Sequence, residues 1–179
     1  TRPVEMTSRA MWQNYQNAVQ ADGRQGIRIL RRQANDLGLD AHKIGICGFS
    51  AGGHLAISCT LNGETKSVEH KVSGMPDFTG LFYPGIPEDA VEAIASRSAP
   101  QSQIRPVGPM FIVNARVDKL TPADKCIDFY NALLRADVNA ELHIFSQGGH
   151  GFDLGVGRGK STALWPTSFV AWLPDCGMI

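Results

Sequence analysis

One serine in the sequence is flanked by small residues. Ser50 lies in the stretch ICGFSAGGHLA, residues 46–56, with Gly48 two residues before it and Gly52 two residues after it. A serine hydroxyl is a weak nucleophile until a base removes its proton. In a strand-to-helix turn of the G-x-S-x-G type the serine has a strained backbone, and small neighbours are needed because the strand and the helix nearly touch. We therefore predict that Ser50 is a nucleophile in a turn formed by Gly48 and Gly52.

The same turn predicts a place where negative charge is stabilised. The backbone N–H of Ala51 follows the serine and lies near the positive end of the next helix. Such an N–H can donate to the oxyanion that forms when a serine attacks a carbonyl group, so we expect Ala51 in an oxyanion hole. The alternative is a glycine-rich packing turn with an unreactive serine. The apolar run before Ser50 and the helical segment after it favour the nucleophile.

A serine nucleophile needs a histidine base and an acid that orients the histidine. In a fold with this turn, the expected chain order is serine, acid, histidine, with acid and base just beyond strand ends. Asp118 closes the apolar run at 108–118, and His150 follows the run at 140–149. We predict His150 as the general base and Asp118 as the orienting acid.

Five other residues are alternative candidates for the base or the acid. His54 lies on the helix after the serine, too close in sequence to reach back over it, and is expected to be structural. His143 lies inside a predicted strand, and His42 and His70 precede strands. The rival acid is Asp153, three residues beyond the predicted base, which is more typical of a solvated or capping group.

Neither a nucleotide nor a metal is expected. GVGRGKS at 155–161 is similar to a phosphate-binding loop, but that motif needs a glycine at position 154, which is leucine. The four cysteines have no C-x-x-C spacing and are expected to be reduced and mostly buried, with one or two disulfides as the alternative: Cys47, Cys59, Cys126 and Cys176. We predict no cofactor and no metal site.

The elements that position these residues alternate along the chain. The run at 43–49 lacks polar alternation, which is typical of a strand buried on both faces of a parallel sheet. Three more apolar runs predict strands at 77–84, 108–118 and 140–149. Helices are expected at 24–37, from 51 to 60, around 90–94, within 121–139 and near the end of the chain. This alternation predicts an α/β fold with a mostly parallel sheet flanked by helices.

The helices are predicted to bury apolar stripes. In 24–37 the arginines are expected on the opposite, exposed face, and Gly38 as the cap. The expected stripes are Ile27, Leu30, Ala34 and Leu37 in that helix, Ala123, Cys126, Tyr130, Leu133 and Leu134 within 121–139, and Phe169, Val170, Trp172 and Leu173 in the last helix.

Composition limits the possible partners. The chain has 179 residues, which suits a single domain at 1–179, with an arm of uncertain structure at 1–23 and an insertion loop at 84–108. Seventeen basic and seventeen acidic residues are interspersed, so we expect neither nucleic acid nor a membrane as a partner. A small, neutral substrate fits better. The cellular compartment stays open between cytoplasmic and secreted.

Four stretches together resemble the α/β-hydrolase superfamily, and more closely its carbohydrate-esterase-like branch, which includes acetylxylan esterases and feruloyl-esterase-like proteins. They are GLDAHKIGICGFSAGGHLA, PDFTGLFYP, the segment from VDKLTP to GGHGFDLG, and WPTSFVAWL. The resemblance implies Ser50 as nucleophile, Asp118 as acid, His150 as base and the Ala51 N–H as oxyanion donor. It also implies hydrolysis of short acyl esters, often acetyl groups on sugars, through an acyl-enzyme without a cofactor.

The resemblance is incomplete at the front of the chain. Relatives have several strands before the helix at 24–37, and an His-Gly-Gly-Gly-like loop there donates a second oxyanion N–H; residues 1–23 contain no such stretch. We therefore expect about four strands, with the strand before Ser50 at an unpaired edge. A homo-oligomer or a complementary chain is expected to cover that edge. Alternatives for function are a non-catalytic binding or assembly module, and a peptidase or lactonase of the same fold.

Overall fold

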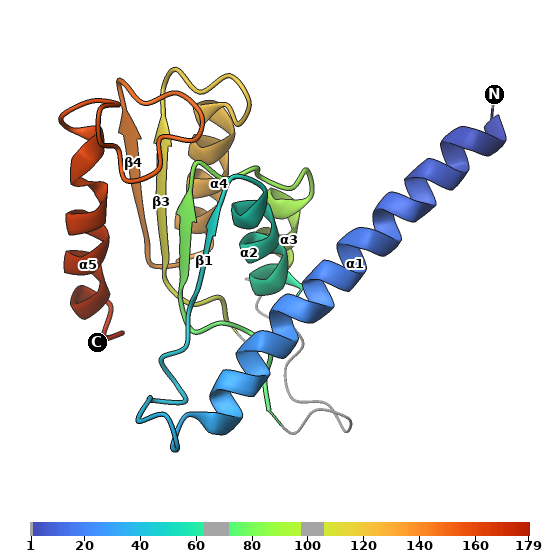
Figure 1. The fold of residues 1–179 in the computed structure, drawn as a ribbon, viewed down its shortest axis with the longest axis horizontal. Coiled ribbons are helices and arrows are strands. Elements are labelled where there is room, and N and C mark those ends of the chain that lie inside the picture. Colours follow the sequence, from blue (N-terminus) through green and yellow to red (C-terminus); the bar gives the residue numbers. More distant parts are fainter. Residues whose placement is uncertain (1, 63–71, 98–105) are drawn as a thin grey trace.

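The computed structural model describes residues 2–62, 72–97 and 106–179 (Figure 1). Four parallel strands form one sheet in the order β1-β2-β3-β4: β1 Ile46–Phe49, β2 Thr79–Phe82, β3 Met110–Ala115 and β4 Ala140–Phe145. The helices are α1 Arg2–Gln33, α2 Ala51–Leu61, α3 Ala90–Arg97, α4 Ala123–Arg135 and α5 Trp165–Asp175, with a short 3₁₀ helix at Thr162–Leu164. The predicted fold class, α/β with a parallel sheet and flanking helices, is confirmed.

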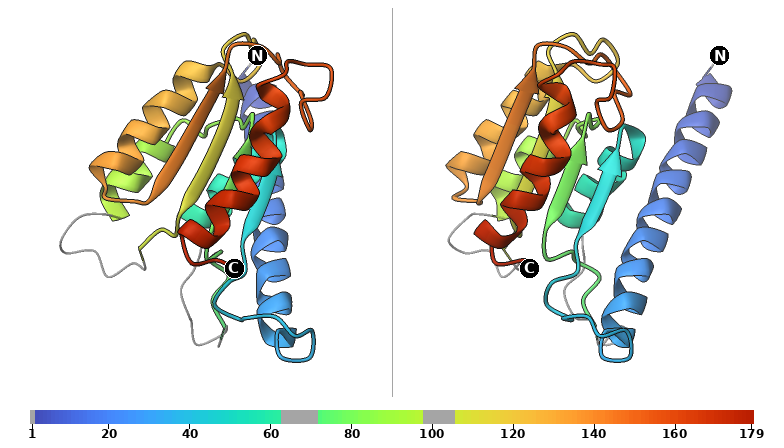
Figure 2. Two further views of the ribbon diagram at one scale, coloured as in Figure 1. Left: turned by 90° about the vertical axis from the view of Figure 1, so that its left-hand side faces the viewer. Right: turned by 60° about the vertical axis from the view of Figure 1, so that its left-hand side comes forward.

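Helices cover both faces of this sheet. Figures 1 and 2 show α2, α3 and α4 on one face and α5 alone on the other. The core beneath α2–α4 is mainly aliphatic, and it includes the fully buried side chains of Ile57, Leu81, Ile112 and Leu133. The core beneath α5 is aromatic, because the rings of Phe169 and Trp172 pack on strand residues such as Phe111. The sheet is thus held between two chemically different layers.

Helix α1 differs from the prediction in length and in its buried face. It begins at Arg2, so the segment of uncertain structure before 24 is helical, and it ends at Gln33, before the expected 37. Ile27 and Ala34 are buried, but Leu30 and Leu37 are exposed. Gly38, the predicted cap, has a φ of 68° and lies in the turn that follows the helix.

The prediction that the arginines of this helix face solvent holds for Arg32, which is exposed, and is wrong for Arg28 and Arg31, which are turned inward. Arg31 pairs with the buried Asp77 in the loop before β2. Its guanidinium also donates to the carbonyl oxygens of Ser73, at 2.8 Å, and Met75, at 3.0 Å. A guanidinium presents several donors in a fixed fork, so one side chain satisfies several loop acceptors at once. This bonding turns Arg31 toward the loop that leads into β2.

Strand β1 is not buried on both faces as predicted. Ile46 is half-buried and Gly48 buried, but Cys47 and Phe49 are exposed. The reason is the position of β1 at the edge: within the described residues it pairs only with β2. The aromatic layer of α5 centres on the inner strands and leaves part of this face of β1 open.

Two further stripe predictions need correction. In α4, Leu134 is exposed and Phe129, which the prediction omitted, is fully buried, while the half-buried Tyr130 packs against the core as predicted. In α5, Val170 is exposed while Trp172 packs inward as predicted. His70 and residues 98–105 of the predicted insertion lie outside the described residues. No helix in the described ranges is both long and apolar enough for a membrane span.

Candidate active site

The turn at Ser50 is built by a sharp passage from β1 into α2. Phe49 ends the strand, Ala51 begins the helix, and Ser50 between them has φ 54° and ψ −117°. Backbone conformations of this kind cost about 1–3 kcal/mol and persist only where the surroundings enforce them. The Ser50 carbonyl oxygen accepts the N–H groups of Gly53, at 3.0 Å, and Gly85, at 3.1 Å, which hold the turn.

Glycines make this turn possible, but not the pair that the sequence predicts. A Cβ on Gly48 would lie 2.1 Å from the Gly52 carbonyl oxygen, so a side chain there has no room. A Cβ on Gly52 would meet nothing within 4 Å. The second tight position is Gly53, where a Cβ would lie 2.6 Å from Cβ of Pro84. Gly52 therefore contributes its backbone, and the steric requirement falls on Gly48 and Gly53.

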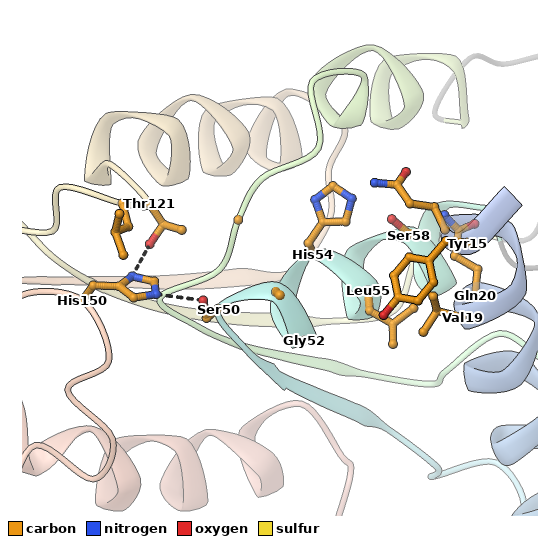
Figure 3. Close-up of a pocket in the computed structure, with 14 residues that line it drawn as sticks. Tyr15, Val19, Gln20, Ser50, Gly52, His54, Leu55, Ser58, Thr121 and His150 are labelled. Carbon is orange, nitrogen blue, oxygen red and sulfur yellow. Dashed lines mark hydrogen bonds between the residues drawn. The ribbon is translucent and has the colours of Figure 1, made fainter. Parts of the chain in front are cut away.

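Ser50, His150 and Asp118 form one chain of hydrogen bonds. The Ser50 Oγ lies 2.8 Å from Nε2 of His150 (Figure 3). The other ring nitrogen, Nδ1, lies 2.9 Å from Oδ2 and 3.2 Å from Oδ1 of Asp118. Ser50 follows β1 directly, and Asp118 and His150 lie in the loops after β3 and β4, so all three are at the carboxyl ends of parallel strands, the usual place for ligands in such folds. In this geometry His150 can accept the serine proton while the carboxylate holds its Nδ1–H.

The carboxylate of Asp118 is almost fully buried, at 5% exposed. Its Oδ1 accepts the backbone N–H groups of Leu120 and Thr121, both at 2.9 Å. Burial raises the pKa of Asp118, but these bonds, the Thr121 hydroxyl and the His150 ring together outweigh it and hold the pKa below its ordinary value. The acid therefore stays anionic at neutral pH, as a partner of an imidazolium must.

Sequence reasoning missed Thr121. Its hydroxyl donates to Oδ2 of Asp118 at 2.8 Å and lies 3.1 Å from both Nδ1 of His150 and the carbonyl oxygen of Tyr83. The Tyr83 ring packs edge-on against the His150 ring, with centroids 5.3 Å apart. The available signal was a threonine three residues after Asp118, a spacing at which an aspartate can bond the backbone and side chain that follow it.

The rival residues do not join this hydrogen-bond chain, although His54 lines the cavity beside Ser50. His143 pairs with Glu141 on β4, and His42 is exposed after α1. Asp153 is exposed, and its carbonyl oxygen accepts the indole N–H of Trp165. His54 is half-buried one helical turn beyond Ser50; burial lowers its pKa, opposed by the charge of Asp89.

A cavity of about 570 Å³ opens beside Ser50. It runs along α2 toward α1 and includes the predicted oxyanion donor, Ala51, at the start of the helix (Figure 3). Its lining residues are Tyr15, Gln16, Val19, Gln20, Ser50, Ala51, Gly52, His54, Leu55, Ser58, Gly85, Leu120, Thr121 and His150. Ser50 and His150 therefore face a space large enough for a small molecule.

The cysteines do not contribute to this site. All four are free thiols, so neither of the alternative disulfides is formed. Burial raises the pKa of Cys59 and of Cys126 to about 11, which keeps both protonated at neutral pH. Within the described ranges, no group of three or more His, Cys, Asp or Glu is arranged to hold a metal ion.

Comparisons with known proteins agree with this architecture. Residues 4–80 match the family model BD-FAE. An acetylxylan esterase from Xylanibacter ruminicola is 29% identical over 75% of this chain. The crystal structure of an acetyl ester-xyloside bifunctional hydrolase from Caldicellulosiruptor lactoaceticus is similar with a TM-score of 0.75 and 27% identity over 89% of this chain. A thermophilic esterase from Thermogutta terrifontis has a TM-score of 0.68 and 27% identity over 89%.

The matched proteins are longer than this chain. The aligned region covers 31% of the acetylxylan esterase, 66% of the Caldicellulosiruptor hydrolase chain and 64% of the Thermogutta esterase chain. The likeness therefore covers most of this chain and only part of these relatives. The described part of the chain has an α/β-hydrolase fold, and its sequence and structure are similar to those of esterases, including an acetylxylan esterase.

Proposed function

We propose that this chain is a serine esterase that hydrolyses short acyl esters through an acyl-enzyme. The observation that carries the proposal is the unbroken hydrogen-bond chain from Ser50 Oγ through His150 to Asp118, with bonds of 2.8 and 2.9 Å. Ser50 is the nucleophile, His150 the general base and Asp118 the acid that orients it. The Ala51 N–H is one oxyanion donor.

The first half of the reaction acylates the serine. Ser50 Oγ bonds to the ester carbonyl carbon while its proton passes to Nε2 of His150, and Asp118 stabilises the resulting imidazolium. The carbonyl oxygen becomes an oxyanion beside the Ala51 N–H at the positive end of α2. When the tetrahedral intermediate collapses, the bond to the alcohol oxygen breaks, and His150 gives its proton to that oxygen.

The second half releases the acid. Water attacks the acyl carbon as its proton passes to Nε2 of His150, and a second oxyanion forms in the same place. Collapse breaks the bond to Ser50 Oγ, which regains its proton from His150. These steps use only the side chains described, the substrate and water.

We propose an acetylated carbohydrate as the substrate. Two of the similar proteins support this choice, since one is an acetylxylan esterase and the other an acetyl ester-xyloside bifunctional hydrolase. The 570 Å³ cavity beside Ser50 also exceeds what an acetyl group alone would fill. The Thermogutta esterase has also been described phosphonylated by cyclosarin and by sarin, so phosphonate reagents suit this type of site.

We also propose that a second polypeptide, another copy or a complementary chain, covers the edge of β1. The support is the open face at that edge, where Cys47 and Phe49 are exposed. An uncovered strand edge with apolar side chains is a template for pairing with another strand.

Hydrolysis of acetate esters tests the proposed activity. The wild-type chain is expected to release acetate from 4-nitrophenyl acetate and from acetylated xylosides, and Ser50→Ala is expected to lose this activity. Ser96→Ala is the matched control, because Ser96 is exposed on α3 and outside the cavity lining. Equal rates in all three proteins, or no hydrolysis by a folded wild-type chain, would contradict the proposal and favour the binding-module alternative.

A further inference from the structure

The cavity beside Ser50 continues as a groove along α2. Besides Gly52, its α2 wall includes Ala51, His54, Leu55 and Ser58, at helical positions i, i+3, i+4 and i+7, which is one face of a helix. This face extends about 10 Å from Ala51, since each helical residue adds about 1.5 Å. An acetyl group on Ser50 needs only the near end. The rest of the groove must therefore serve another part of the substrate.

Helix α1 supplies the opposite wall. Tyr15, Gln16, Val19 and Gln20 line the far end of the groove, and Figure 3 shows His54 between Ser50 and these side chains. The wall combines one aromatic ring, two amides and one small apolar side chain. Rings that offer an apolar face, together with amide donors and acceptors, suit a ligand that is itself a ring with hydroxyl groups.

Three polar side chains that line the groove can form hydrogen bonds with a ligand. Among the described residues, no hydrogen bond is formed by the His54 ring or by the side-chain amides of Gln16 and Gln20. Burial favours the neutral form of His54 by lowering its pKa, and a neutral imidazole has one donor and one acceptor. The groove therefore contains donors and acceptors that a ligand could satisfy.

This chemistry distinguishes the two halves of an ester. The lining is mostly apolar, so the ligand must offer an apolar face. A long hydrocarbon acyl chain would do so, but it would remove water from two amides and an imidazole without replacing their hydrogen bonds, which is unfavourable. A sugar would replace those bonds with its hydroxyl groups and pack one face against Tyr15. In an acetylated carbohydrate, the sugar is the alcohol half.

We propose that the groove between α1 and α2 is the subsite for the alcohol half of the ester, and that it binds a glycosyl unit. Gln20 and Tyr15 are its specificity-determining residues. This inference rests on the proposed esterase function and deepens it, because it assigns recognition of the alcohol half to a helix that contributes none of the three reacting side chains.

The first test compares three esters in the wild-type chain and two variants. The esters are methyl acetate, a monoacetylated methyl xyloside and methyl octanoate. Gln20→Leu removes the amide in the groove, and Gln25→Leu is the matched control on an exposed position of the same helix. The ratio of kcat/KM for the acetylated xyloside over methyl acetate is expected to fall about tenfold or more in Gln20→Leu and to stay within about twofold in Gln25→Leu.

Either of two results would overturn the inference. An unchanged ratio in Gln20→Leu, or a gain in octanoate hydrolysis with no loss on the xyloside, would show that the groove does not bind the alcohol half. Circular dichroism melting of each variant confirms that it is folded before the rates are compared.

Binding of the product alcohol separates this inference from the proposed function. Saturation-transfer NMR with methyl xyloside is expected to detect binding to wild type and to Gln25→Leu, and a large loss of binding to Gln20→Leu. Binding without hydrolysis of any ester would support the subsite and overturn the esterase proposal. Hydrolysis of methyl acetate without any methyl xyloside binding would do the reverse.

Discussion

At the scale of single residues, the site depends on groups that hold the reacting side chains in place. Thr121 bridges the acid, the base and the loop after β2 through one hydroxyl group, which lies within 3.1 Å of all three. It touches no reacting atom, so we regard it as a positioning residue. Asp118 and His150 could be proposed from the sequence, because an acid and a histidine beyond predicted strand ends are visible there. Thr121 could not, because its role arises from hydrogen bonds that only the folded loops create.

Replacement of Thr121 tests this positioning role. Thr121→Val keeps the shape of the side chain but removes a hydrogen bond to a charged carboxylate, an interaction of about 1.5–3 kcal/mol. We expect kcat/KM to fall about 10- to 100-fold, and Thr121→Ser to restore most of it.

A titration distinguishes positioning from a general structural role. The Thr121 hydroxyl helps to lower the pKa of Asp118, so its removal should raise that pKa. Carboxyl-carbon NMR of Asp118 is expected to show a higher midpoint in Thr121→Val than in wild type. An unchanged midpoint together with unchanged kcat/KM would contradict the role assigned to Thr121.

At the scale of elements, the order and the approximate positions of strands and helices could be predicted from apolar runs and turn residues. The strand at 43–49 was found at Ile46–Phe49, and the helix at 51–60 was found as Ala51–Leu61. Which face each helix buries was harder to predict. Arg31 turns inward because the loop before β2 supplies its acceptors, and helical periodicity alone carries no information on that loop.

Alanine substitutions at the two glycines predicted for the turn between β1 and α2 should have opposite effects on the free energy of unfolding. Gly48→Ala would place a methyl group 2.1 Å from a backbone oxygen, so we expect a loss of about 1–3 kcal/mol in the free energy of unfolding. Gly52→Ala has open space in a helix and should gain up to about 1 kcal/mol. Urea unfolding of both variants measures these changes, and a loss at Gly52 equal to that at Gly48 would contradict the packing described.

At the scale of the whole molecule, the open edge of β1 is the feature from which we expect the chain to associate in solution. Cys47 and Phe49 of this strand are exposed residues, and Phe49 directly precedes Ser50. Sequence reasoning predicted the edge from the number of strands, yet it also treated β1 as buried on both faces. That prediction failed because burial depends on what packs over a strand, and α5 packs mainly over its neighbours.

Association at this edge is expected in solution. Light scattering should give a mass well above the 19.4 kDa of one chain. Cys47 should react slowly with a maleimide at high protein concentration and faster on dilution, whereas Cys59 and Cys126, buried and with a pKa of about 11, should stay protected in both conditions. A monodisperse 19.4 kDa species in which Cys47 reacts at the same rate at every concentration would contradict the proposed association.

The central claim is that Ser50 is an activated nucleophile, and intact-mass spectrometry after treatment with a fluorophosphonate tests it most directly. A serine reacts with this reagent when a base and an oxyanion donor surround it. We predict a single adduct on the wild-type chain and on Ser96→Ala, and none on Ser50→Ala. A folded wild-type chain that takes up no reagent, or an adduct that persists in Ser50→Ala, would contradict the claim.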